Sequence, residues 1–150
     1  SKSYNMTGWR IAFCCGNEAA VQALGMVKNN LDSGQFAAVQ DAAIAALSGD
    51  QQCVADLCAL YRRRRDLVVE ALRAIGLSCD APRATIYVWA KVPAGETSES
   101  FATKLLVRAH VIVTPGSGYG PGGEGYVRIS LPTPDDRLLE AVRRIKETMA

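Results

Sequence analysis

Apolar positions recur through the first half of the chain mostly at the spacing of helices. The exception is the continuous apolar run at 10–16, RIAFCCG, which predicts a buried strand of a parallel sheet, because both faces of such a strand are covered. Beyond this run, apolar side chains three or four residues apart predict helices that begin near Asn17, Phe36 and Asp50. The third helix is expected to run for about seven turns to Gly76, long enough to connect two lobes.

Strand and helix patterns alternate in the second half. Runs rich in β-branched and aromatic residues predict strands at 84–92, 111–114 and 126–131. Helices are expected from Thr97 or Ser98 to about His110, and from Thr133 onward, where Thr-Pro-Asp-Asp supplies a cap, a proline and first-turn acids. The expected class is α/β, with an α+β lobe from about residue 77 in which helices lie on a small, mostly antiparallel sheet.

Composition and charge exclude several classes of function. The 150 residues are 49% hydrophobic, enough for a real core, and the net charge of +2 is too small to indicate a nucleic-acid or acidic membrane partner. The sequence has no run of eighteen apolar residues that would predict a membrane helix. It also does not open with the basic segment and following apolar segment that predict a secretory signal. We therefore expect no nucleic acid and no membrane as partners.

The five cysteines, at 14, 15, 53, 58 and 79, lack the spacing of a zinc site or a disulfide framework. Reduced, mostly buried thiols in a cytoplasmic protein are therefore expected, with no metal site. His110 is the only histidine, and it lies near a predicted helix end without a cluster of possible partners. A histidine-based catalytic triad is therefore not expected.

Lys2 and Arg10 lie at the two ends of a loop that leads into the predicted strand. An isolated lysine near a terminus is usually a solvated surface residue. This loop, however, is expected at the edge of a sheet, where ligands collect, and a lysine in a water-poor site can bind a carbonyl covalently. Arg10 offers a planar, permanent charge suited to phosphate, and Gly8 lets the backbone pass closely. Together these residues describe a pyridoxal-phosphate site.

The segment SKSYNMTGWRIAF resembles the lysine segment of the class I aminotransferases, which are pyridoxal-phosphate enzymes of fold type I. It has the family's Ser-Lys pair, then Gly-x-Arg with the arginine eight residues after the lysine, then the apolar run. The similarity continues through NNLDSGQFAAVQDAAIAAL, YRRRRDLVVEAL, ATIYVWAKVP and VIVTPGSGYGPGGEGYVRISL, and covers essentially the whole chain. Within the class, DSGQF and TPGSGYG are most similar to LL-diaminopimelate aminotransferase-like members.

This resemblance implies residue roles and a domain arrangement. Lys2 would form the internal aldimine with pyridoxal 5′-phosphate, and Arg10 would hold the cofactor phosphate. Residues 1–50 would be the C-terminal remnant of the large cofactor-binding domain, 51–76 a bridging helix and 77–150 the small domain. Because the chain starts inside a family motif, we expect the rest of the large domain to lie outside these residues, and the intact protein to be a homodimer.

Arg128 lies in YVRISL, whose side chains alternate between two faces of a predicted strand. If Val127, Ile129 and Leu131 pack on the helices, Arg128 points the other way, and alone it would be interpreted as an exposed strand arginine. The preceding TPGSGYGPGGEG is too glycine-rich for simple packing, and lets another backbone or a ligand come close. In the family, the arginine of this strand binds the substrate α-carboxylate, which would place the substrate Cα–H within reach of Lys2.

Two further motifs have better structural than functional interpretations. GYGPGG at 118–123 matches a dinucleotide-binding spacing, but it leads into a strand instead of opening a helix. RRRR at 62–65 falls within an amphipathic helix near Asp66 and Glu70, which favours a solvated helix face over a nucleic-acid site.

The resemblance implies ping-pong transfer of an amino group between an amino acid and a 2-oxo acid in the intact enzyme. The 150 residues alone are expected to be inactive. Two alternatives remain open: a β-lyase or synthase of the same fold, and a non-catalytic fragment whose residues 1–50 bind a partner.

Overall fold

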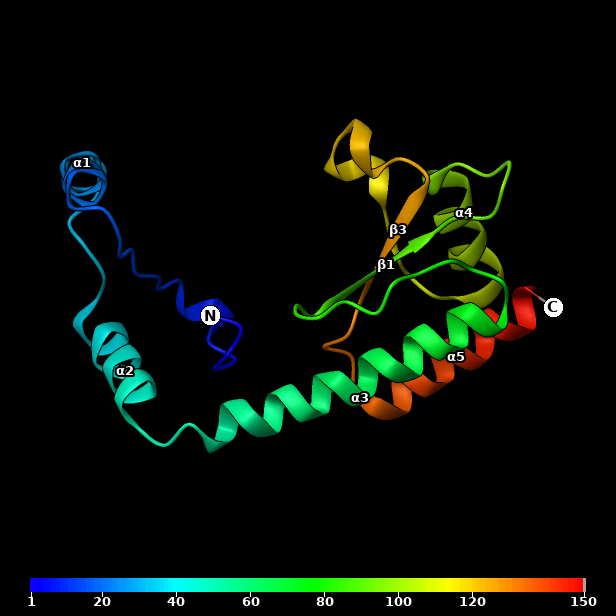
Figure 1. The fold of residues 1–150 in the computed structure, drawn as a ribbon, viewed down its shortest axis with the longest axis horizontal. Coiled ribbons are helices and arrows are strands. Elements are labelled where there is room, and N and C mark those ends of the chain that lie inside the picture. Colours follow the sequence, from blue (N-terminus) through cyan, green and yellow to red (C-terminus); the bar gives the residue numbers. More distant parts are fainter. Residues whose placement is uncertain (150) are drawn as a thin grey trace. The chain divides into compact units, whose positions relative to one another are not determined.

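The computed structural model describes residues 1–149, and the chain divides into two compact units, Ser1–Cys58 and the part from Ala59 onward. Figure 1 shows the elements in chain order. The helices are η1 (Thr7–Trp9), α1 (Glu18–Asn29), α2 (Ala37–Ser48), α3 (Gln52–Ala74), α4 (Ser98–Lys104), the π-helical turn η2 (Leu105–Ala109), η3 (Gly116–Tyr119), η4 (Pro121–Gly123) and α5 (Asp135–Met149). The strands are β1 (Tyr87–Lys91), β2 (Thr114–Pro115) and β3 (Tyr126–Ser130).

Local sequence signals set the helices of the first unit. Asn17 caps α1, because its Oδ1 accepts a hydrogen bond from the backbone N–H of Ala20 at 3.2 Å. Asp50 precedes α3 and accepts one from the N–H of Gln52 at 3.0 Å. The helices expected near Asn17, Phe36 and Asp50 are confirmed. No side chain among residues 1–58 is buried, so these helices form without a core.

The strand predicted at 10–16 is wrong for this structure, because the segment from Arg10 to Gly16 has neither helical nor strand pairing. Apart from Ile11, which is partly exposed, its residues are exposed, and Phe13 is 76% exposed. A strand needs neighbours for its backbone hydrogen bonds, and the first unit offers none. The apolar run therefore carries the composition of a buried strand without the partners that would make it one.

The second unit contains an antiparallel sheet with the strand order β1-β3-β2. Trp89 of β1 and Thr114 of β2 both lie opposite Arg128 of β3. The mostly antiparallel sheet is confirmed, but the strand predicted at 111–114 is only two residues long and begins at its last position. The reason is that the N–H of Val111 bonds to the carbonyl of Leu105, which extends the preceding helical turn.

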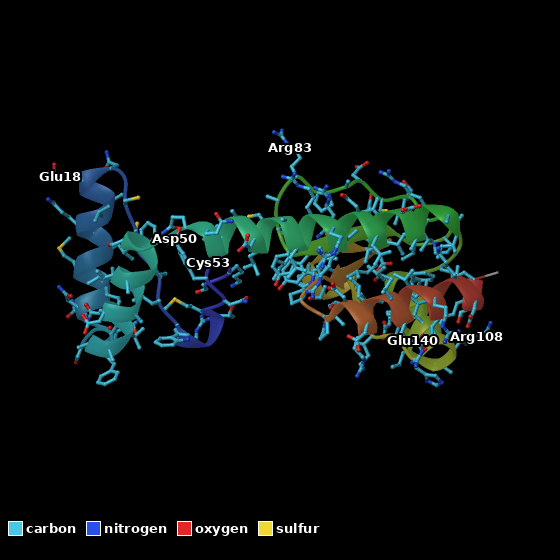
Figure 2. The ribbon with its side chains drawn as sticks, turned by 90° about the horizontal axis from the view of Figure 1, so that it is seen from below. Glu18, Asp50, Cys53, Arg83, Arg108 and Glu140 are labelled. Carbon is cyan, nitrogen blue, oxygen red and sulfur yellow. The ribbon has the colours of Figure 1, made fainter. Side chains whose placement is uncertain are left out.

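One face of this sheet carries the hydrophobic core. Val88 and Val127 are fully buried there. They join a single cluster with apolar side chains of helices α3, α4 and α5, for example Leu72, Phe101 and Leu138. Figure 1 shows α3 and α5 running side by side along the sheet, and Figure 2 shows side chains filling the space between these two helices. The expected lobe of helices on a small sheet is therefore present.

The arginine run at 62–65 is not a uniformly solvated helix face. The Arg64 side chain is only 12% exposed, and it donates hydrogen bonds to the carboxylate of Asp135 and to the carbonyl of Leu131. Arg63 donates to the same carboxylate, which lies at the start of α5. The two guanidinium groups hold the pKa of Asp135 below its usual range, and the cluster joins α3 to α5. The structural interpretation of the arginine run therefore holds, but Arg64 is mostly buried in a contact between helices and does not lie on a solvated face.

Candidate functional site

Lys2 and Arg10 lie on a loop whose two ends meet in the first unit. The Ser1 hydroxyl donates a long hydrogen bond, 3.4 Å, to the carbonyl of Ile11. Within the loop, the N–H of Met6 donates to the carbonyl of Ser1 at 2.7 Å. Because Ser1 precedes Lys2 and Ile11 follows Arg10, this hydrogen bond brings together the two ends of the loop from which the candidate residues extend.

Arg10 has a backbone conformation that is unusual for its residue type. It follows η1 with φ 51° and ψ 45°, in the left-handed region. An ordinary side chain in that region costs roughly 1 kcal/mol, and such residues gather at functional sites. Its Nη1 donates to the carbonyl of Thr7 at 3.2 Å, the one hydrogen bond of this guanidinium among residues 1–149. The remaining N–H groups are available for an anion such as phosphate.

The side chain of Lys2 is exposed, and its ammonium has no hydrogen-bond or ion-pair partner within the described part of the chain. The first unit alone therefore does not supply the water-poor surroundings that a covalent lysine needs. The loop does offer an amine and a guanidinium without counter-ions, and this pair suits the aldehyde and the phosphate of pyridoxal phosphate. In that respect the residues present fit the cofactor.

The loop is also anchored to the following helices by a contact that the sequence interpretation missed. The Tyr4 hydroxyl donates a 2.7 Å hydrogen bond to Oε1 of Gln51, in the turn between α2 and α3. A hollow of about 440 Å³ lies beside this contact and is lined by Asn5, Ala46, Cys53 and their neighbours. Neither Lys2 nor Arg10 lines it. No sequence signal marks a contact between positions so far apart.

Arg128 belongs to the second unit, whereas Lys2 and Arg10 belong to the first. The alternation predicted for its strand is confirmed: Val127 and Ile129 are buried, whereas Arg128 lies on the opposite face. The guanidinium carbon is 4.1 Å from the ring centre of Tyr87 and 4.7 Å from that of Tyr119. Both distances are well inside the range of cation–π attraction.

The charge of Arg128 has no counter-ion within the described residues. Its Nε is buried and has no hydrogen-bond partner, and no carboxylate of residues 1–149 is paired with it. A buried donor without a partner is costly, and a partly desolvated cation attracts carboxylates strongly. Among the described residues, Arg128 therefore has donor groups that could bind an anion, and an exposed strand arginine is the poorer description.

Aromatic side chains surround this guanidinium on the outer face of the sheet. Trp89, directly opposite Arg128, makes edge contacts with Tyr119 at 5.5 Å and with Tyr126 at 6.3 Å between ring centres. The sequence interpretation did not single out these rings. A signal for two of them was present, since Tyr87 and Trp89 alternate with buried residues along β1 and thus share one face.

The glycine-rich stretch before β3 forms two short helical turns whose backbones touch. A Cβ on Gly116 would lie 1.9 Å from the carbonyl oxygen of Gly123, and one on Gly123 would lie 2.1 Å from that of Gly116. Neither position has room for a side chain. The glycines let another backbone come close, one of the two uses expected for them, and the stretch leads into β3 without opening a helix.

Ser98 and Glu124 fasten this glycine-rich loop to the start of α4. Glu124 Oε1 accepts from the N–H of Ser98 at 2.8 Å, and Oε2 accepts from its hydroxyl at 2.9 Å. The same Ser98 oxygen accepts from the N–H of Ser117 at 3.3 Å. The two hydrogen bonds from Ser98, with one from the N–H of Gly125, hold the pKa of Glu124 below its usual value. Ser98 itself is fully buried.

The prediction of mostly buried thiols is wrong for this structure. All five cysteines are free, but Cys14, Cys15, Cys53 and Cys58 are exposed and only Cys79 is buried. The four exposed ones belong to the first unit, where no side chain is buried. Burial raises the pKa of the Cys79 thiol. Through residue 149, no three His, Cys, Asp or Glu side chains gather in a possible metal site.

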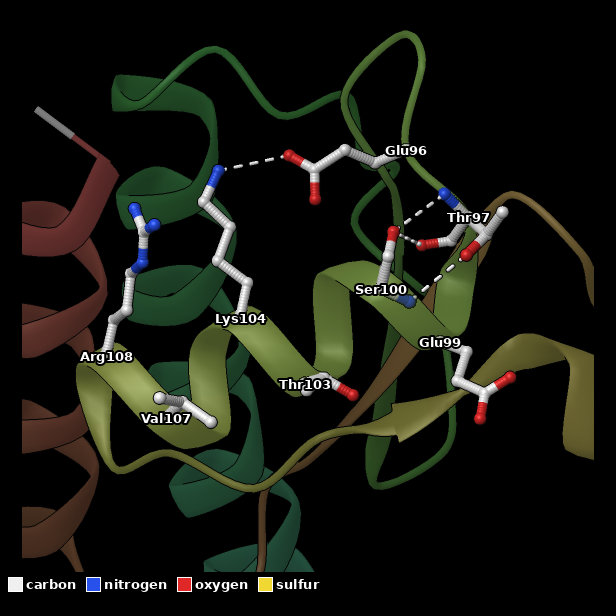
Figure 3. A pocket seen from close by; sticks show the side chains of 8 residues that line it. All are labelled: Glu96, Thr97, Glu99, Ser100, Thr103, Lys104, Val107 and Arg108. Atoms are coloured by element: carbon white, nitrogen blue, oxygen red, sulfur yellow. Dashed lines mark hydrogen bonds and ion pairs between the residues drawn. The ribbon is translucent and has the colours of Figure 1, made fainter.

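A shallow hollow of about 800 Å³ beside α4 contains none of the predicted site residues (Figure 3). Lys104 pairs with Glu96 at 3.0 Å across it, and Thr97 and Ser100 exchange the hydrogen bonds that cap the helix. Arg108 extends along the far end. Four of the residues that line the hollow pair with one another, and we assign the hollow no chemical role. Across residues 1–149, no helix is long and apolar enough to cross a membrane.

Comparisons of the sequence with known proteins agree on one family. The sequence model of the family "Aminotransferase class I and II" matches residues 1–145. The LL-diaminopimelate aminotransferase of Desulforudis audaxviator is 57% identical over 146 residues, which are 97% of this chain and 37% of that protein. The corresponding enzyme of Moorella thermoacetica is 49% identical over 149 residues, 99% of this chain and 38% of its own. The chain thus spans less than two-fifths of these relatives.

Solved structures agree with the sequence relatives. An aminotransferase from Staphylococcus aureus superimposes with a TM-score of 0.92 and 36% identity, over 98% of this chain and 39% of that one. A probable N-succinyldiaminopimelate aminotransferase from Thermus thermophilus gives a TM-score of 0.91 and 41% identity over the same shares.

Proposed function

Because the chain belongs to the class I and II aminotransferase family, we propose that it is the C-terminal part of a pyridoxal-phosphate enzyme that moves an amino group between an amino acid and a 2-oxo acid. The observation that carries this proposal is the guanidinium of Arg128, which contacts two tyrosine rings and has no counter-ion in the described chain. Because the chain covers under two-fifths of the length of these relatives, we propose that the active enzyme is longer than these 150 residues. We take residues 1–50 as part of its large domain, 51–76 as the bridging helix and 77–150 as the small domain.

Arg128 binds the α-carboxylate of the substrate in this proposal. Two parallel N–H···O hydrogen bonds from a guanidinium fix the plane of a carboxylate, and so fix the direction of the bonds at the neighbouring Cα. The aromatic neighbours remove part of the water around Arg128, because its Nε is buried, and a lower local polarity strengthens these bonds. The relatives named for LL-diaminopimelate make that amino acid the first substrate to test.

Lys2 and Arg10 serve the cofactor end of the reaction. Pyridoxal phosphate, when bound, supplies an aldehyde that combines with amines and a ring that withdraws electrons from the substrate Cα. Arg10 would hold the phosphate with the N–H groups that have no partner in the described chain, and the amine of Lys2 would remove the proton from the substrate Cα. We place this protein in the cytoplasm as a homodimer, with its thiols reduced.

The test uses the full-length protein that contains these residues. We expect Arg128→Lys to lower kcat/KM for an amino acid by roughly one to two orders of magnitude, because a lysine keeps the charge but loses one charged hydrogen bond of about 1.5–3 kcal/mol. Arg128→Ala should cost more. For the decarboxylated analogue, which lacks the group that Arg128 binds, both variants should match the wild type.

The same preparation separates the roles of Arg128 and Arg10. Cofactor retention should be unchanged in Arg128→Ala and weakened in Arg10→Ala, because only Arg10 is assigned to the phosphate. An equal loss for the amino acid and its decarboxylated analogue in Arg128→Ala would make Arg128 a structural residue. Borohydride labelling of a lysine other than Lys2 would contradict the assignment of the covalent residue.

A further inference from the structure

Tyr119 supplies the second of the two rings that enclose the guanidinium of Arg128. The other ring, from Tyr87, lies on a strand whose register with β3 is fixed by backbone pairing. Tyr119 lies instead on the glycine-rich loop, at the end of η3, and it reaches across to the sheet. The position of this loop therefore decides whether Arg128 has one aromatic neighbour or two.

Specific contacts hold the loop where Tyr119 can do this. The touching backbones of Gly116 and Gly123 set its internal fold. Ser98 and Glu124 then tie it to α4, through the hydrogen bond from Ser117 and those between the two side chains. The edge of Trp89 against Tyr119 adds a third contact, from β1. A continuous series of contacts thus runs from the start of α4 to the guanidinium.

We propose that Tyr119 is a positioning residue for Arg128, and that Ser98 and Glu124 set its place through the glycine-rich loop. This inference rests on the proposed carboxylate-binding role of Arg128. The two rings lie 4.1 Å and 4.7 Å from the guanidinium carbon, and the Nε of the same side chain is buried. Two cation–π contacts restrict the positions that the guanidinium can adopt. The terminal N–H groups are then held ready for a carboxylate, which lowers the cost of ordering them on binding.

The first test compares two substitutions of Tyr119 in the full-length enzyme. Tyr119→Ala removes the ring, and we expect it to lower kcat/KM for the amino acid by about tenfold, the size of a partly desolvated cation–π contact. Tyr119→Phe keeps the ring and should restore the wild-type value. The decarboxylated analogue should react equally with all three proteins. In Arg128→Ala, adding Tyr119→Ala should cause no further loss.

A matched pair of glycine substitutions tests the loop. Gly116→Ala forces a Cβ against the backbone of Gly123, so the loop must move and the selective loss should resemble that of Tyr119→Ala. Gly118→Ala adds the same atom in the same turn, where nothing lies within 4 Å, and should behave as wild type. Equal behaviour of the two glycine variants would overturn the role of the loop.

A readout without catalysis separates this inference from the proposed function. NMR of the 150-residue chain measures hydrogen exchange at Nε of Arg128, which should be slow in the wild type and in Tyr119→Phe but fast in Tyr119→Ala. Unchanged exchange in Tyr119→Ala would overturn the positioning role while leaving carboxylate binding by Arg128 intact. If Arg128→Ala affects the amino acid and its decarboxylated analogue equally, carboxylate binding fails and this inference fails with it.

Discussion

Phe13 in the first unit is 76% exposed, whereas Phe101 in the second is fully buried. The difference extends to each unit as a whole. Helices α1 and α2 have no buried side chain, while α3 alone places four in the core, all in its C-terminal half. Both regions have strong helix signals and similar apolar residues, so these features cannot be what separates them.

What separates the two regions is whether the partners of each apolar face lie within the described chain. Strand β1 pairs with β3, and its core face meets side chains of α3, α4 and α5 that all lie in the second unit. The apolar run at 10–16 meets no strand. Helices can form from local hydrogen bonds and caps, but burial requires a second surface. The second unit is therefore a folded lobe, and the first is a set of elements without a core.

The largest expected effect is a contrast between these two phenylalanines. In the 150-residue chain, Phe101→Ala should lower the free energy of unfolding of the second unit by about 3–5 kcal/mol, because it leaves a cavity in a closed core. Phe13→Ala should leave it unchanged, since that ring is already in water. Urea unfolding followed by circular dichroism measures both. Similar losses for the two variants would break the comparison.

Association should follow the same division. We expect the 150-residue chain to self-associate through residues 1–58, because an apolar run without strand neighbours and large exposed side chains such as Leu31 and Phe36 face solvent there. Sedimentation at increasing concentration measures the effect. A chain beginning at Ala59 is the matched control and should remain monomeric. A clean monomer for the whole chain, with residues 1–58 ordered, would contradict the expectation.

A smaller effect should come from Glu124, whose lowered pKa reports its hydrogen bonds to Ser98 and Gly125. Because the folded-state pKa lies below the ordinary 4.5, the ionised carboxylate stabilises the fold fully above that value. The stabilisation is lost as the pH falls below it. The stability difference between wild type and Glu124→Gln should therefore be largest near neutral pH and should shrink in acid. Thermal unfolding from pH 7 to 3 checks the trend, and a constant difference would contradict it.

The sequence predicted the helices and the face of Arg128 because those features depend on neighbours in the chain. Asn17 and Asp50 mark their helices by short-range caps, and alternation along β3 separates Arg128 from Val127. The prediction failed at 10–16, where the outcome depends on strands that the first unit lacks. Local pattern cannot say whether a neighbour is present.

The surroundings of Arg128 were predicted only in part for a related reason. Its charge and direction follow from strand phase, but the contact with Tyr119 depends on how a glycine-rich loop folds back. Likewise, the arginine run gave no sign that Arg64 would bind Asp135, which lies 71 positions away. Contacts of this range are set by the complete packing of the lobe, and no short window of sequence contains them.

The contact between Gly116 and Gly123 separates these two glycines from Gly118 and Gly122, which look the same in the printed sequence. A library covering every substitution would find these two positions intolerant, since even a methyl group meets a carbonyl oxygen there. Gly118 and Gly122, with open space around the added atom, would accept alanine. Gly118 and Gly122 are therefore the two positions of this glycine-rich loop at which a side chain for attaching a label could be introduced.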